Sequence, residues 1–295
     1  MKRFIVILVI LVLGISGWFI SRPYDVKVRL EFRTFPGTII QTIKTWGNGL
    51  YQVEYVSQDS TVSITQRVLA NEITHLIDWQ LEMKNDSICE LTAFISNETG
   101  TFGERLMIPF QETRLEASAR QLMSEFRLVM KELLNDTKVE VQGITETDSV
   151  FCVFMPLESV QQGKAYGMMS SFSLLTDFIL ENELVSKGPP IIEVEDWSIS
   201  SDKLLYNFCF PIVPNDSLPV STYFSYKWMA PKKALKAVYN GNYINSDRAW
   251  FALVAFADRN DIAIERKPIE VFYNNPNLGG NETDWKAEIF MPIVE

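Results

Sequence analysis

The stretch KGPPIIEVEDWSISSDKLLYNFCFPIV, residues 187–213, is repeated in outline by RKPIEVFYNNPNLGGNETDWKAEIFMPIV, residues 266–294. In each copy a proline opens an apolar, strand-like run, and Pro190 corresponds to Pro268. Each copy also ends a second such run on a proline, Pro211 in the first and Pro292 in the second. The second copy has the longer loop, which is rich in Asn and Gly. An internal repeat of this kind decides the fold, because each copy is one supersecondary unit packed on its neighbour.

A helix and a further strand precede each copy of the repeat. Helical spacing of apolar residues predicts helices at residues 170–184 and 246–259. Apolar runs predict strands at residues 151–155 and 235–239. Each unit is therefore β-α-β-β, and two units form one α+β domain, residues 138–295, with a pseudo-two-fold axis. A groove between the copies is a natural ligand site, since internal interfaces concentrate pockets.

The second copy and the residues before it resemble a known family. The similarity is carried by VYNGNY at residues 238–243, Trp250 on the predicted helix, PIEVFYNNP at residues 268–276, and EIFMP at residues 288–292. In this order and spacing they look like the gyrase-inhibitor-like family, the effector-binding domain that also occurs in AraC-type and multidrug-responsive transcription regulators. The resemblance implies a small-molecule ligand, cationic or aromatic, and no resident cofactor.

The resemblance also implies roles for individual residues. Glu288, four residues before the final proline, is expected to face the pocket among aromatic walls, and Tyr243 and Trp250 match aromatic positions of the family. The first copy has Asn207 where the second has Glu288, so the expected pocket has one carboxylate rather than a pair. The alternatives are an outward-facing Glu288 on an edge strand, and core packing for Tyr243 and Trp250.

Two departures from the family pattern bear on catalysis. Phe272 falls where the family commonly has Tyr, and Asn275 falls where it commonly has Asp. We therefore expect a non-catalytic binding protein without a catalytic residue. The ligand-binding residues that we predict are Glu288, Tyr243, Trp250, Phe272 and Asn207. The alternatives are a hydrolase of small xenobiotic-type substrates that uses Glu288, and the effector module of a transcription regulator without its DNA-binding domain.

Residues 24–137 have a different pattern, which predicts a second α+β domain. The expected elements are a strand at 25–32, a short helix at 38–46, strands at 50–56, 60–68, 75–83 and 87–95, and a long helix at 113–134. This order resembles the START-like helix-grip (polyketide cyclase-like) family, in which a long C-terminal helix closes a curved sheet over a cavity. The alternative is an antiparallel sheet packed on one helix, without a ligand.

Residues 1–23 are predicted to attach the chain to a membrane. Lys2 and Arg3 precede FIVILVILVLGISGWFI, residues 4–20, which contains no charged residue. As a helix this run would be about 26 Å long, close to the lower limit for crossing a bilayer. Trp18 and Phe19 follow Ser16-Gly17 directly, so a small-x-small cleavage site is hard to place. We expect a single-pass N-terminal anchor with the remainder extracytoplasmic, and a cleaved signal peptide is the alternative.

Composition excludes several other classes of function. The 295 residues have a formal net charge of −10 and no visible cluster of Lys and Arg, which argues against a nucleic-acid partner. The three cysteines, Cys89, Cys152 and Cys209, are far apart, and His75 is the only histidine, so no metal site is expected. The predicted role of these four residues is packing.

Overall fold

The computed structural model describes residues 7, 23–59, 62–98, 112–199 and 202–294. The chain divides into two compact units, Met1–Lys131 and Glu132–Glu295. The predicted membrane anchor, residues 4–20, falls outside the described residues apart from Ile7. Within the described ranges, no helix combines the length and apolar character needed to cross a bilayer.

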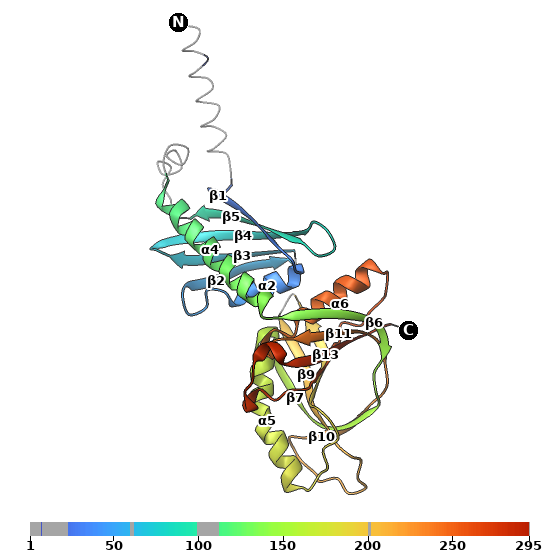
Figure 1. The fold of residues 1–295 in the computed structure, drawn as a ribbon. Coiled ribbons are helices and arrows are strands. Elements are labelled where there is room, and N and C mark those ends of the chain that lie inside the picture. Colours follow the sequence, from blue (N-terminus) through green and yellow to red (C-terminus); the bar gives the residue numbers. More distant parts are fainter. Residues whose placement is uncertain (1–6, 8–22, 60–61, 99–111, 200–201, 295) are drawn as a thin grey trace. The chain divides into compact units, whose positions relative to one another are not determined.

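The described part of the first unit is a five-stranded antiparallel sheet with two helices (Figure 1). Its elements are β1 (Val26–Phe32), α2 (Pro36–Thr45), β2 (Gln52–Asp59), β3 (Ser63–Ala70), β4 (Ile73–Met83), β5 (Cys89–Asn97) and α4 (Arg114–Asn135). The strand order is β1-β5-β4-β3-β2, so the first strand pairs with the last. The predicted order of strand, short helix, antiparallel strands and long helix is confirmed.

The core of the first unit lies between its sheet and α4. Alternate residues of β4 are buried, as the pleat requires, and α4 buries one stripe of its surface. Phe126 of α4 packs against Trp46 and Trp79, with ring centroids 5.5 and 5.1 Å apart. His75 is fully buried, and its Nε2 atom lies 2.8 Å from Ser118 Oγ. Both aromatic packing and His75 therefore belong to the interior of this unit.

The second unit is an eight-stranded antiparallel sheet in the order β10-β7-β9-β8-β12-β13-β11-β6. Its strands are β6 (Lys138–Glu146), β7 (Val150–Val160), β8 (Ile191–Ser198), β9 (Lys203–Pro211), β10 (Ser225–Met229), β11 (Lys233–Asn240), β12 (Ile269–Phe272) and β13 (Lys286–Pro292), and its helices are α5 (Lys164–Glu181) and α6 (Arg248–Arg259). The predicted duplication is confirmed, because β7-α5-β8-β9 and β11-α6-β12-β13 repeat one order and meet where β8 pairs with β12. The outermost strands, β10 and β6, extend the two copies.

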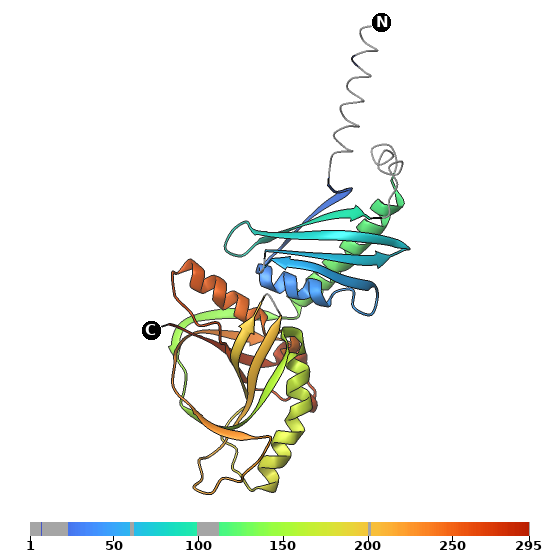
Figure 2. The ribbon, with the colours of Figure 1, turned by 180° about the vertical axis from the view of Figure 1, so that it is seen from behind.

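The eight-stranded sheet is strongly curved, and its two faces differ (Figure 2). α5 packs on β7 and β9, and α6 packs on β6, β11 and β13. The face under these helices buries large side chains that include Tyr206, Phe208 and Trp250. The opposite face has its own apolar cluster, formed by Cys152, Ile191, Cys209, Met229, Ala234, Ile269 and Phe290. We call the first the helix face and the second the groove face.

Candidate ligand-binding groove

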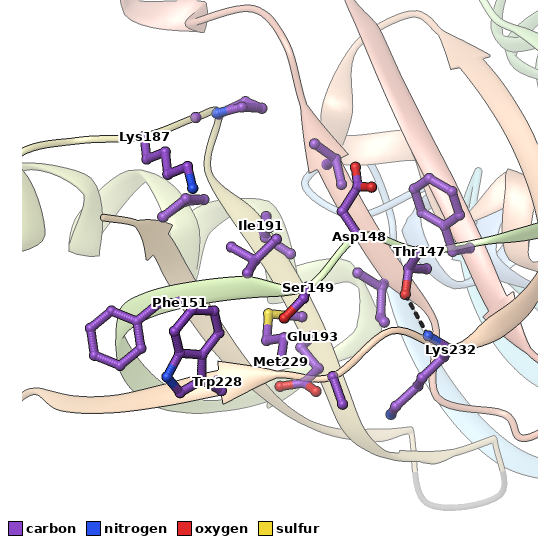
Figure 3. Close-up of a pocket in the computed structure, with 18 of the residues that line it drawn as sticks. Thr147, Asp148, Ser149, Phe151, Lys187, Ile191, Glu193, Trp228, Met229 and Lys232 are labelled. Carbon is purple, nitrogen blue, oxygen red and sulfur yellow. Dashed lines mark hydrogen bonds between the residues drawn. The ribbon is translucent and has the colours of Figure 1, made fainter. Parts of the chain in front are cut away.

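A cavity of about 480 Å³ lies on the groove face of the second unit (Figure 3). Its floor consists of Ile191, Met229, Ile269 and Phe290, which belong to the apolar cluster of this face. These residues come from both copies of the repeat, since Ile191 is on β8 and Ile269 and Phe290 are on β12 and β13. The groove therefore spans the junction between the copies, where the sequence predicts it.

Aromatic side chains form the walls of the groove. Phe151 and Trp228 lie side by side at one end, with ring centroids 5.2 Å apart (Figure 3). Trp228 is 60% exposed, and Tyr273, which also lines the groove, is 49% exposed. Exposed aromatic rings beside an apolar floor provide contact area for a ligand, because their burial on binding would release water from apolar surface.

Glu288 lines this groove and is surrounded by hydrogen-bond donors. It lies on β13 between β12 and β11, so it is not on an edge strand, and its side chain is 14% exposed. Lys286 Nζ and Lys236 Nζ lie 2.8 and 2.9 Å from its oxygens, and Tyr273 Oη donates a hydrogen bond of 3.0 Å. Burial alone would raise the pKa of Glu288, but the bonds from Lys286, Lys236 and Tyr273 together lower it. The carboxylate is therefore ionised at neutral pH.

A second carboxylate, Glu193 on β8, lines the same groove, and so does Asp148. The expectation of a single carboxylate is therefore wrong. Glu193 forms an ion pair with Lys227 of β10, and Glu195 lies 3.6 Å from the same ammonium group. Burial works to lower the pKa of Lys227, but the two glutamates hold it above its ordinary value. The first copy thus supplies its charge from β8, not from the position that matches Glu288.

The other four predicted ligand-binding residues do not line the groove. Tyr243, Trp250 and Phe272 are buried on the helix face, where Tyr243 Oη donates to the Lys286 carbonyl and Trp250 Nε1 donates to Glu270. Asn207 is directly opposite Glu193 in the β8–β9 register and donates to Glu195 at 2.7 Å. Of the predicted set, only Glu288 lines the groove, and Asn207 is on the same face of the sheet outside the lining.

Sequence reasoning also missed an ion pair on the helix face. Lys164 Nζ lies 2.7 Å from both carboxylate oxygens of Glu270 and 2.7 Å from Ser246 Oγ. Lys164 comes from α5 of the first copy, and Glu270 from β12 of the second. Both side chains are almost completely buried. The signal in the sequence was the single charged residue, Glu270, within the apolar run of β12.

The part of the chain that the structure describes contains no candidate metal site. No group of three or more His, Cys, Asp or Glu side chains is placed there to hold a metal ion. Cys89, Cys152 and Cys209 are buried free thiols. The functional groups that line the groove are carboxylates, ammonium groups and aromatic rings.

Several solved structures are similar to part of this chain. No family model matches the chain. No curated protein matches it either. The C-terminal domain of EcmrR matches 54% of this chain over 98% of its own length, with 12% identity and a TM-score of 0.45. SAV2435 bound to tetraphenylphosphonium matches 52% of this chain over 94% of its own, with 14% identity and a TM-score of 0.39. A hydrolase from Listeria innocua matches 52% over 92%, with 7% identity and a TM-score of 0.35.

Proposed function

We propose that this chain is an effector-binding protein that holds a small organic cation with an aromatic or apolar body in the groove of its second unit. One observation carries the proposal: a single groove of about 480 Å³ combines an apolar floor, exposed aromatic walls and partly buried carboxylates. Its size lies within the range of small-molecule sites, roughly 300–1,000 Å³. The resemblance of residues 238–292 to the effector-binding family supports the same reading.

The charges in the groove indicate where the ligand's positive group binds. Glu288 contacts two ammonium groups and a tyrosine hydroxyl, so its negative charge is already balanced by neighbouring donors. Glu193 and Glu195 share one ammonium group, that of Lys227. Two carboxylates therefore face one lysine beside this part of the groove, whose lining also includes Lys187 and Lys232. We therefore place the cationic group of the ligand beside Glu193, with its rings against Phe151 and Trp228.

A titration of the full-length chain with cationic aromatic dyes tests this proposal. Glu193→Gln should weaken dye binding at least tenfold, since charge-assisted bonds in partly buried sites contribute about 1.5–3 kcal/mol. Glu158→Gln is the matched control, because Glu158 forms an exposed ion pair with Lys203 away from the groove. The proposal fails if the wild-type chain binds none of the dyes and mass spectrometry finds no co-purified small molecule.

Membrane attachment is a further part of the proposal and rests on the uncharged run at residues 4–20. In that arrangement the two units would be tethered outside the cytoplasm, so the ligand would arrive from that side. Fractionation of cells that produce the full-length chain tests the attachment. The chain should remain in the membrane fraction after an alkaline wash and should be released by detergent.

A second candidate function is hydrolysis, and the contact between Tyr273 and Glu288 favours it. The sequence shows Phe at position 272, but the groove receives a phenol from the next residue, whose Oη lies 3.0 Å from Glu288. Burial and this bond raise the pKa of Tyr273 to about 12, and the lysines lower that of Glu288. A carboxylate with a lowered pKa is a weak general base at neutral pH, so binding remains the better-supported function. Turnover of a small ester that disappears in Glu288→Gln would reverse this ranking.

A further inference from the structure

A second cavity, of about 450 Å³, lies on the helix face of the same unit. Met168, Met169 and Phe172 of α5 form one wall, and Phe208, Phe210 and Phe272 of the sheet form another. The ring centroids of Phe172 and Phe210 are 5.4 Å apart. Met169 is 57% exposed, although it belongs to this apolar lining. The cavity is therefore an apolar surface open to solvent.

Several polar groups of this second cavity are paired within the protein, and Glu282 is the one ionisable carboxylate among the residues that line it. Tyr243 Oη donates to the Lys286 carbonyl at 2.8 Å and accepts from the Asn274 amide at 3.0 Å. Asn242 Nδ2 donates to Glu282 at 2.9 Å, and Asn275 Oδ1 accepts from the Asn277 amide at 3.0 Å. The rest of the lining is mainly aromatic and thioether surface from α5 and the sheet, which suits an uncharged hydrocarbon.

Two residues, Pro189 and Tyr273, line both cavities. Tyr273 follows the last residue of β12, where the chain leaves the sheet, and its hydroxyl reaches Glu288 on the groove face. Pro189 lies two residues before β8, the strand that pairs with β12. The two cavities therefore adjoin at one end of the strands that join the copies, with the Tyr273 ring between them.

We propose that one amphiphilic ligand occupies both cavities, with its cationic head in the groove and its hydrocarbon tail in the second cavity. This inference rests on the proposed function for the position of the head. The division of chemistry supports it. Glu193, Asp148 and Glu288 line the groove together with Lys187 and Lys232. The second cavity is lined mainly by aromatic rings and methionines, with Glu282 as its one carboxylate. The ligand class is a long-chain alkylammonium or an aromatic cation with an alkyl substituent.

The test is a chain-length series. Butyl-, hexyl-, octyl- and decyltrimethylammonium are titrated into the full-length chain below their micelle concentrations. Each added pair of methylenes should tighten binding by roughly tenfold while the tail enters the second cavity. In the double variant Met169→Gln/Ile244→Asn, this gain should fall to less than half, because two exposed apolar residues at the mouth become polar. Leu174→Gln is the matched control, an exposed residue of α5 outside the cavity.

The outcomes separate the two proposals. If butyltrimethylammonium binds and affinity is flat along the series, the tail site is wrong and the groove proposal stands. If no member of the series binds, the proposed function itself is contradicted. A decyl probe with a terminal photoreactive diazirine adds a direct readout. Labelling of residues 164–181 supports the tail site, and labelling confined to residues 225–232 overturns it.

Discussion

The two faces of the eight-stranded sheet contain the same pair of chemical groups in different surroundings. On the helix face, the Lys164–Glu270 pair is almost completely buried. On the groove face, Glu288 and Lys236 are 14% and 21% exposed. Glu270 and Glu288 are on neighbouring strands of one sheet. The comparison shows that residue type alone does not separate a structural ion pair from one that a ligand can reach.

What differs is the set of partners. Glu270 receives bonds from Lys164, Ser246 and Trp250, all of which are closed to solvent. Its pair joins α5 of one copy to β12 of the other, so it holds the copies together. In the groove, water can replace a lysine that a ligand displaces. We therefore expect partners to exchange on the groove face only, and four predictions address the two faces.

The largest effect is expected from Glu270→Gln. This change leaves the Lys164 ammonium buried without its counter-ion, which should lower the free energy of unfolding by about 3–5 kcal/mol. Guanidinium denaturation of the full-length chain measures it. The double variant Lys164→Met/Glu270→Leu is the control and should recover part of the loss, because neither charge is then buried, although Trp250 Nε1 loses its acceptor. A single variant within about 1 kcal/mol of wild type would show that the pair is not a structural link.

Gly167→Ala should have the next largest effect. A Cβ atom at this position of α5 would lie 2.1 Å from Tyr206 Oη, which is buried on the helix face. Overpacking of this kind should cost about 1–3 kcal/mol of unfolding free energy. Adding Tyr206→Phe removes the hydroxyl, so the double variant should be more stable than Gly167→Ala alone. Equal stability of the two variants would show that the Tyr206 hydroxyl is not the cause of the loss.

Trp228→Ala should separate binding from stability. Because Trp228 is largely exposed, we expect a loss of unfolding free energy below about 0.5 kcal/mol. Its ring lies beside Phe151 in the groove, so affinity for a cationic aromatic dye should fall about tenfold. Parallel dye titration and denaturation check both expectations. A large stability loss with unchanged dye affinity would show that Trp228 stabilises the fold and does not contact the ligand.

The smallest effect is expected from Glu288→Gln, on the stability of the fold at acidic pH. The pKa of Glu288 is lower in the folded chain than in the unfolded one, so its ion pairs stabilise the fold above the ordinary glutamate pKa. That contribution is lost as pH falls through the folded value. Glu288→Gln should therefore flatten the stability profile below about pH 4.5 by less than about 1 kcal/mol, since the group is partly exposed to solvent. Identical acid profiles for wild type and variant would contradict the ion pairing.

Much of the fold could be predicted because local sequence patterns specify most of its helices and strands. The paired prolines, Pro190 with Pro268 and Pro211 with Pro292, mark equivalent strands, and helical spacing located α4, α5 and α6. β6 was missed, although Val139 and Val141 alternate with charged residues as a strand requires. Its pairing with β11, by contrast, is a long-range contact that no local pattern specifies.

The site was harder to predict because strand faces alternate with every residue. Phe272 and Tyr273 are neighbours, yet one packs under the helices and the other lines the groove. The family resemblance placed the aromatic role at Phe272, and a shift of one residue changes the face. Glu193 could have been found only from the β8–β12 pairing, which brings it opposite Ile269. That pairing is a long-range contact that no local pattern specifies. As ligand-binding residues, Tyr243, Trp250, Phe272 and Asn207 stay predictions.

The junction between the copies has a consequence for how the second unit folds. β8 and β12 are joined by a register of only three residue pairs, whereas β7–β9 and β11–β13 pair along most of their length. Each copy closes its own sheet from contacts that are comparatively near in sequence, and such contacts cost less loop entropy to form. We therefore expect two half-sheets to form first and to dock last along β8 and β12. The groove would then be the final feature to appear, assembled in the same step that buries Lys164 against Glu270.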